Sequence, residues 1–274
     1  MNSNPLTQYF RHPVLHVSLP SQGKFYPAKA LDLIEENQYP ILSLTRQDEM
    51  VFMTTTGQVS GSSVVSVIQS CVPNIKNAWK MPAIDIDKLL IAIKIATHGT
   101  QLESNTICTN CETVNKISVD LQKVLDQVSA PDYSVPVQVG EIEIYLRPIT
   151  YQQLWDNTQI QFNEEDIIDM LQNDSVDDQT KSDKIDELLA KVRSLSTQIL
   201  LQNIHHVQTP VERVDNPEYI AEWLSNCDRS VYVQLQDSIN KYTADTQIKS
   251  VDVTCSACAT LYQHGYTLDM SDNE

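Results

Sequence analysis

The chain has 274 residues, of which 41% are apolar and 20% charged, so it is long enough to bury a core in one large or two small domains. With 36 acidic and 19 basic residues, its formal net charge is −17. Such a surface repels phosphates and anionic lipid headgroups. We therefore expect neither nucleic acid nor a membrane among its partners.

The sequence also gives an expectation for the compartment. No stretch approaches the roughly 20 apolar residues of a membrane helix, because Lys94 interrupts the longest apolar run, 89–96. Residues 1–5 show no basic region followed by an apolar core, so no signal peptide is expected. In a reducing cytoplasm, the six cysteines are expected to be thiols or metal ligands rather than disulfides.

The N-terminal segment, 1–60, is expected to be extended and rich in β-structure. Strand-like patterns cover 14–19 and 39–44, and turn residues occupy 20–23. Four aromatic side chains lie among its prolines and turns: Phe10, Phe25, Tyr26 and Tyr39. They form either a contact surface for another subunit or an arm that folds back on its own core.

Residues 61–100 are expected to be helical. A first helix begins after a cap at 61–63, carries apolar residues at helical spacing and ends before Pro73. A second helix follows Pro82 and ends at Gly99, which is placed as its C-terminal cap.

The second half of the chain predicts a hairpin and then helices. Alternating apolar residues on either side of Gly140 predict a β-hairpin over 137–148. Residues 149–244 have a helical pattern, with an exposed acidic loop near 173–178 and a helix start at 215–218.

Four cysteines form the most specific chemical pattern. Cys108 and Cys111 make one C-x₂-C pair, and Cys255 and Cys258 make another. Two such pairs supply the four thiolates that tetrahedral Zn²⁺ prefers, with no open coordination position. The alternatives are two unmetallated surface turns or a C-x-x-C redox pair, although neither pair opens a helix after a strand, as a redox site requires.

The two pairs are far apart in the sequence, but a weak repeat links them. Val119 and Leu121 follow Cys108 at the offsets at which Tyr266 and Leu268 follow Cys255. Each half therefore reads as a cysteine turn followed by a strand, and two halves would make a zinc ribbon. The entropic cost of closing a long loop grows slowly with length, whereas a structural zinc site supplies on the order of 10 kcal/mol. We expect a structural clamp that holds one Zn²⁺.

Other polar residues suggest no catalytic site. Cys71 and Cys227 are expected to be small buried hydrophobic residues, and His205 and His206 to have capping or surface roles. The acids at 164–166, like Asp85 and Asp87, fit the start of a helix. Because the sequence has no metalloprotease, nucleophile-elbow or phosphate-loop motif, we expect a protein that is not an enzyme.

These patterns together predict an α+β fold with a helical body, a β-rich N-terminal segment and a split zinc-ribbon (Cys₄) module. The expected divisions are 1–60 (extended, β-rich), 61–100 (helical), 101–125 and 245–274 (the two ribbon halves), 137–148 (hairpin) and 149–244 (inserted helical region).

Six stretches and the two cysteine pairs, taken in order, form a specific composite pattern. The stretches are Leu19–Pro27, Arg46–Met50, Val67–Trp79, Pro82–Ala96, Leu146–Tyr151 and Ala221–Leu224. This pattern, which covers most of the chain, resembles the T4-type baseplate proteins of contractile-tailed bacteriophages.

The resemblance implies a non-enzymatic tail protein that is a structural component or an assembly factor of the baseplate hub. Its partners would be other hub or wedge subunits, and its location the host cytoplasm during assembly or the virion tail baseplate. The alternative is a zinc-ribbon regulator associated with nucleic acid or polymerase. Lys116, Lys123 and Lys249 lie near the cysteine pairs, but acidic residues surround them.

Overall fold

The computed structural model describes residues 4–53, 60–159, 195–246 and 248–265. The protein is α+β, and it divides into two compact units. Unit 1 comprises residues 1–130 and 246–274, and unit 2 comprises residues 131–245. Among the described residues, no helix has the length and apolar character needed to cross a membrane.

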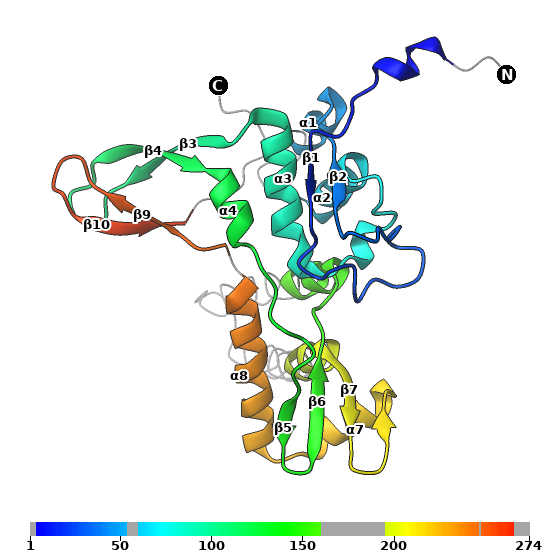
Figure 1. Ribbon diagram of the computed structural model, residues 1–274. Coiled ribbons are helices and arrows are strands. Elements are labelled where there is room, and N and C mark those ends of the chain that lie inside the picture. The colour runs from blue at the N-terminus through cyan, green and yellow to red at the C-terminus, as the bar shows by residue number, and fades with distance from the viewer. Residues whose placement is uncertain (1–3, 54–59, 160–194, 247, 266–274) are drawn as a thin grey trace, which may run out of the picture. The chain divides into compact units, whose positions relative to one another are not determined.

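The first part of unit 1 places a small two-stranded sheet beside helices (Figure 1). Strands β1 (Leu15–Val17) and β2 (Tyr39–Ile41) pair antiparallel, and both contact helix α3 (Ile86–His98). The remaining elements are η1 (Pro5–Tyr9), α1 (Arg46–Met53), α2 (Gly61–Cys71), η2 (Ala78–Lys80) and η3 (Ala83–Asp85). Helix α1 lies within the segment expected to be extended.

Helices α2 and α3 end where expected because their C-terminal signals are strong, but α2 begins at Gly61, within the stretch 61–63 that was expected to be its cap. Ser60 caps α2, its side chain accepting a hydrogen bond from the Ser63 amide at 3.2 Å. Gly99 ends α3 at a φ of 88°, a conformation that glycine adopts without strain. The apolar faces of both helices are buried, so packing stabilises them as well as capping.

The aromatic side chains of the N-terminal segment are only partly exposed to solvent. Tyr39 is 1% exposed and belongs to the core, and Phe25 and Tyr26 are half-buried. Phe10 is 58% exposed. Arg11 holds the base of the arm by donating hydrogen bonds to Ser70 O at 2.7 Å and to Asp48 at 3.2 Å.

A buried carboxylate fixes the loop at 19–27. Asp85 is 0% exposed and accepts hydrogen bonds from the Ser21 amide at 2.8 Å, the Ser21 hydroxyl at 2.6 Å and the Tyr26 hydroxyl at 2.8 Å. Asp85 does precede helix α3, as expected, but its side chain does not cap that helix. It holds together a loop that belongs to a distant part of the sequence.

Gly23 is expected to contribute to stability, because any other residue would be strained in its backbone conformation. Its φ is +74°, and an added Cβ would lie 2.8 Å from Leu33 Cδ2. Gly23→Ala should therefore lower the free energy of unfolding by about 1–3 kcal/mol, measured by chemical denaturation. Gly265→Ala is the matched control, because no atom lies within 4 Å of the added Cβ. Equal stability of the two variants would contradict the prediction.

The second part of unit 1 consists of two β-hairpins and a short helix. Strands β3 (Gln101–Ile107) and β4 (Val114–Asp120) pair along their whole length, and helix α4 (Leu121–Gln127) follows β4. Strands β9 (Val251–Thr254) and β10 (Leu261–His264) form the other hairpin. Each C-x₂-C pair lies in the loop of one hairpin. We call these two hairpins together the ribbon.

Unit 2 contains an antiparallel four-stranded sheet in the order β5-β6-β7-β8. Its strands are β5 (Val137–Val139), β6 (Ile142–Leu146), β7 (Ile204–Gln208) and β8 (Arg213–Val214). Helices α7 (Pro217–Asn226) and α8 (Arg229–Thr246) contribute Ile220, Leu224, Leu235 and Ile239 to the same apolar core as the sheet. Residues 151–159 and 195–203 are also helical.

Two expectations for unit 2 meet different outcomes. The hairpin over 137–148 is present, with Gly140 at a φ of +58° in its turn. The region 149–244 is not wholly helical as expected, because it includes β7 and β8. Ile204 and Val207 are buried against β6, and this tertiary packing outweighs the helical pattern of the neighbouring residues.

Candidate metal centre

The four cysteines of the two C-x₂-C pairs converge in the ribbon. The Sγ atoms of Cys108, Cys111, Cys255 and Cys258 all lie within 4.8 Å of one another. One C-x₂-C pair comes from each hairpin, so the site joins chain segments on either side of unit 2 in the sequence. None of the four forms a disulfide bond.

The two cysteine turns have the same backbone geometry. The amide of Cys108 donates to Thr113 O at 3.0 Å, and the amide of Cys255 donates to Thr260 O at 2.9 Å. Glu112 and Ala259 occupy equivalent positions, and each has a φ of 56°. This left-handed residue turns the chain back into the second strand of each hairpin, so that both cysteines of a pair face the same point.

The distances between sulfurs fit a tetrahedral ion. Cys108 Sγ lies 3.7 Å from Cys258 Sγ, and Cys111 Sγ lies 3.6 Å from Cys255 Sγ. Thiolates bound to a tetrahedral zinc at about 2.3 Å lie roughly 3.8 Å apart. Disulfide bonding would instead require about 2.05 Å. The chemistry and spacing of these donors therefore fit one metal ion with four thiolate ligands.

Hydrogen-bond donors favour the thiolate at two of the four cysteines, Cys255 and Cys258, whereas burial and the neighbouring sulfurs of Cys111 and Cys255 raise the pKa of Cys108 to about 11. The hydroxyl of Thr260 lies 3.2 Å from Cys258 Sγ, and it contributes most to lowering the pKa of Cys258 to about 5. The backbone amides of Cys258 and Ala257 lower the pKa of Cys255. Because metal ions bind the thiolate, these contacts make the second cysteine pair the better ligand pair of the two.

Asn115 connects the two hairpins beside the metal ligands. It lies on β4 and is 5% exposed. Its Oδ1 accepts hydrogen bonds from the amide and the hydroxyl of Ser256, both at 2.8 Å. Its Nδ2 donates to Tyr262 Oη at 3.2 Å and approaches Cys255 Sγ at 3.6 Å. A single buried side chain thus orients the second cysteine turn relative to the first.

The ribbon has little apolar core of its own. Its buried cluster consists of Cys108, Cys255, Val253 and Tyr262, with Ile117 packed against it. Two short hairpins with so small a core are marginally stable in water without a further link. The four cysteines and Asn115 are therefore the main connections between the hairpins.

The other sequence candidates lie elsewhere. Cys71 is buried, near Arg11 rather than in a ligand set, and Cys227 is half-buried. His205 and His206 lie on β7, with their Nδ1 atoms 2.7 Å apart and the His206 ring stacked on Tyr145 at 4.5 Å. The acids at 164–166 lie outside the described residues. Within the described part of the chain, the cysteine cluster is the only group of three or more side chains able to hold a metal ion.

Sequence reasoning found the four cysteines but not their polar neighbours. Thr113 and Thr260 each stand two residues after the second cysteine of a pair, and this repeated C-x₂-C-x-T pattern could have identified them. Asn115 and Tyr262 also occupy equivalent positions, seven residues after the first cysteine of each pair. The expected repeat of Val119 and Leu121 after the second cysteine pair falls on Tyr266 and Leu268, which lie outside the residues that the structure describes.

Comparison with known proteins gives a family match. Residues 13–269 match the family model described as T4 bacteriophage base plate protein. No curated protein and no solved structure matches the chain. The match includes both cysteine pairs and all of unit 2.

Proposed function

Since the chain belongs to the T4 bacteriophage base plate protein family, we propose that this structural protein acts at the baseplate hub, as a component or as an assembly factor. Its mode of action would be protein–protein binding to other hub or wedge subunits. The observation that carries the proposal is the family match over residues 13–269. The host cytoplasm would be its location during assembly, and the virion tail baseplate its location if it remains in the particle.

We propose further that the cluster of Cys108, Cys111, Cys255 and Cys258 holds Zn²⁺ in a structural role. Four thiolates are soft ligands, and their tetrahedral spacing suits zinc. A four-cysteine site leaves no open position for water or substrate, so the ion would stabilise the ribbon rather than catalyse a reaction. This argument supports the proposal that the protein is not an enzyme.

The charge of the chain supports binding to proteins rather than to nucleic acid. A net charge of −17 suits complementary basic faces of partner subunits, which gives binding specificity and faster association. The rival proposal, a zinc-ribbon regulator bound to nucleic acid, needs free basic residues near the ribbon. Lys116, Lys123 and Lys249 each have acidic residues three or four positions away in the sequence, and Lys123 lies 3.8 Å from Asp120.

Mass spectrometry of purified virions and of hub assembly intermediates tests the proposed role. We expect the protein in intermediates, and its presence in virions would identify a permanent subunit. Its absence from both would contradict a role in the hub. A DNA titration at several salt concentrations provides the second test, because tight binding with a steep salt dependence would favour the regulator.

A further inference from the structure

Unit 2 contains a polar pocket that is separate from the ribbon. Its volume is about 370 Å³, near the lower end of the range for small-ligand sites (about 300–1,000 Å³). The side chains that define its chemistry are Arg147, Gln153, Gln198, Gln202, His205 and Asp215. All of them belong to unit 2, and the proposal concerns this pocket alone.

Arg147 is fixed at the wall of the pocket with most of its donors unused. Its backbone amide donates to Asn203 O at 2.7 Å, and its Nε donates to Gln202 O at 3.0 Å. Neither terminal guanidinium nitrogen forms a hydrogen bond or an ion pair with any residue that the structure describes. The guanidinium is half-buried, and burial lowers its pKa from the usual value. A desolvated cation of this kind gains most from an anionic partner.

The glutamines add further donors. Gln153 Oε1 accepts hydrogen bonds from the Thr150 amide at 2.9 Å and the Thr150 hydroxyl at 3.2 Å. Gln202 Oε1 accepts one from Asn157 Nδ2 at 2.9 Å. Because both amide oxygens are engaged, the unused capacity of these two side chains is that of N–H donors. The pocket is therefore rich in donors and suits a ligand that accepts hydrogen bonds.

The acidic and titratable neighbours do not cancel this preference. Asp215 is engaged by Arg213, whose Nε lies 2.9 Å and 3.0 Å from its two carboxylate oxygens. Burial, followed by the charges of Arg213 and Arg147, lowers the pKa of His205, which is therefore neutral at pH 7. Of the two charged side chains that line the pocket, Asp215 is already paired with Arg213, which lies outside the lining, so the charge of Arg147 stays available to a ligand.

We infer that this pocket binds a carboxylate, and specifically the side chain of a glutamate or aspartate presented by another polypeptide. The planar fork of Arg147 matches a carboxylate with two parallel hydrogen bonds, and the glutamine amides can donate to the same group. A single negative charge fits better than the double charge of a phosphate beside Asp215. The polypeptide source rests on the proposed assembly function, whereas the carboxylate preference rests on the pocket alone.

A titration of the full-length protein, followed by NMR of the side-chain amide resonances of Gln153 and Gln202, tests this inference, because these groups line the pocket in the unchanged protein and in every variant. The probe is glutamate capped at both ends as N-acetyl and N-methylamide, and the capped glutamine is its neutral counterpart. We expect a saturable shift with the glutamate probe and none with the glutamine probe. Arg147→Gln should weaken binding about tenfold or more, and Arg147→Lys should bind at an intermediate level.

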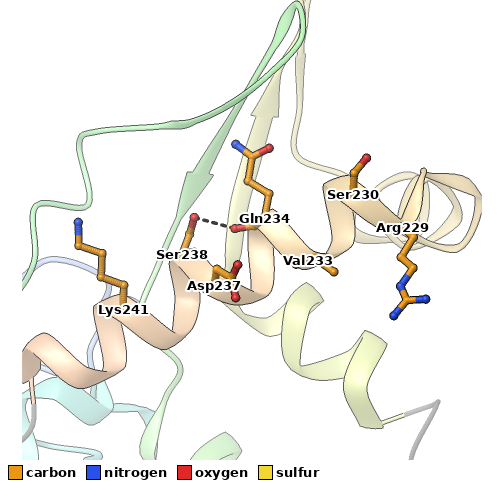
Figure 2. Close-up of a pocket in the computed structure, with 7 residues that line it drawn as sticks. All are labelled: Arg229, Ser230, Val233, Gln234, Asp237, Ser238 and Lys241. Atoms are coloured by element: carbon orange, nitrogen blue, oxygen red, sulfur yellow. Dashed lines mark hydrogen bonds between the residues drawn. The ribbon is translucent and has the colours of Figure 1, made fainter.

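Arg229→Gln is the matched control. Arg229 also belongs to unit 2, but it is exposed on α8 beside a different surface hollow (Figure 2). This variant loses the same charge and should bind the glutamate probe as the unchanged protein does. Equal weakening by both substitutions, or equal binding of both probes, would overturn the inference.

Two further ligands, titrated in the same way, define the chemistry of the binding partner more closely. Inorganic phosphate that binds more tightly than the glutamate probe would overturn the assignment to a carboxylate. Acetate that binds as tightly as the capped glutamate would overturn the assignment to a peptide side chain. Failure of these tests leaves the proposed hub role intact, because that role is tested in virions and assembly intermediates.

Discussion

Replacing Cys255 with Ser is expected to abolish metal binding and to unfold both hairpins of the ribbon. Cys255 is 3% exposed, and its sulfur lies 3.6 Å from that of Cys111 in the other hairpin. Because the ribbon has a core of only a few side chains, the ion would supply most of the link between its halves. A structural zinc site contributes on the order of 10 kcal/mol, so its loss should have a large effect.

Elemental analysis and hydrogen exchange measure this effect. The unchanged protein is expected to carry about one zinc ion per chain, as four thiolates hold a single ion. Peptides covering 101–120 and 251–264 should lose protection from exchange in Cys255→Ser, and in the unchanged protein after chelation. Peptides covering 204–239 should keep their protection, because their core lies within unit 2.

Cys227→Ser is the control for loss of a thiol. Cys227 is half-buried, and its sulfur lies 3.4 Å from Leu224 O, outside the ribbon. This variant should keep its metal and the protection of both hairpins. The metal hypothesis would be wrong if the purified protein held no metal and both hairpins were fully protected under chelation.

The parts of the fold that the sequence predicts well are those with local signals. Helix α2 has a serine cap and a proline two residues beyond its end, and α3 ends at a glycine with a positive φ. The hairpin at Gly140 follows from alternation and turn chemistry. The convergence of the four cysteines was also predicted, because coordination chemistry relates residues that are distant in the sequence.

The parts that the sequence does not predict depend on distant contacts. Strand β7 contains His205 and His206, which carry little strand signal, and it forms because Ile204 and Val207 bury against β6. Asn115 has no pattern of its own on β4, and its role appears only when the second hairpin is in place. The sequence does not predict that Arg147 keeps unused hydrogen-bond donors, because this depends on how residues 195–203 and helix α7 surround its side chain.

Asp85 shows why a local interpretation can be incomplete. An acid before a helix suggests an interaction with the positive end of the helix dipole. The structure places Asp85 there, but its hydrogen bonds go to Ser21 and Tyr26. The sequence separation between these residues hides the contact, so the carboxylate's main role could not be predicted.

Asp85→Ala is expected to destabilise unit 1 by about 3–5 kcal/mol, because it leaves three donors of the 19–27 loop without their acceptor. The Tyr26 hydroxyl stays protonated as a donor, since burial and Asp85 raise its pKa. Chemical denaturation at pH 7 measures the loss. Glu36→Ala, which removes an exposed carboxylate from the same unit, should change the free energy of unfolding far less.

The pH dependence of this loss distinguishes the role of Asp85 from simple packing. Burial raises the pKa of Asp85 to about 6, against the opposing effect of the hydrogen bonds from Ser21 and Tyr26 and the charge of Lys88. In the unfolded chain an aspartate titrates near 3.9, so between about pH 4 and 6 the folded protein binds a proton that the unfolded chain does not. The contribution of Asp85 to stability therefore grows as the pH falls through this window.

The loss of stability caused by Asp85→Ala should be about 1 kcal/mol larger at pH 5 than at pH 7. A penalty that shrinks on acidification would show that the carboxyl group has a lowered pKa, and that its charge stabilises the fold.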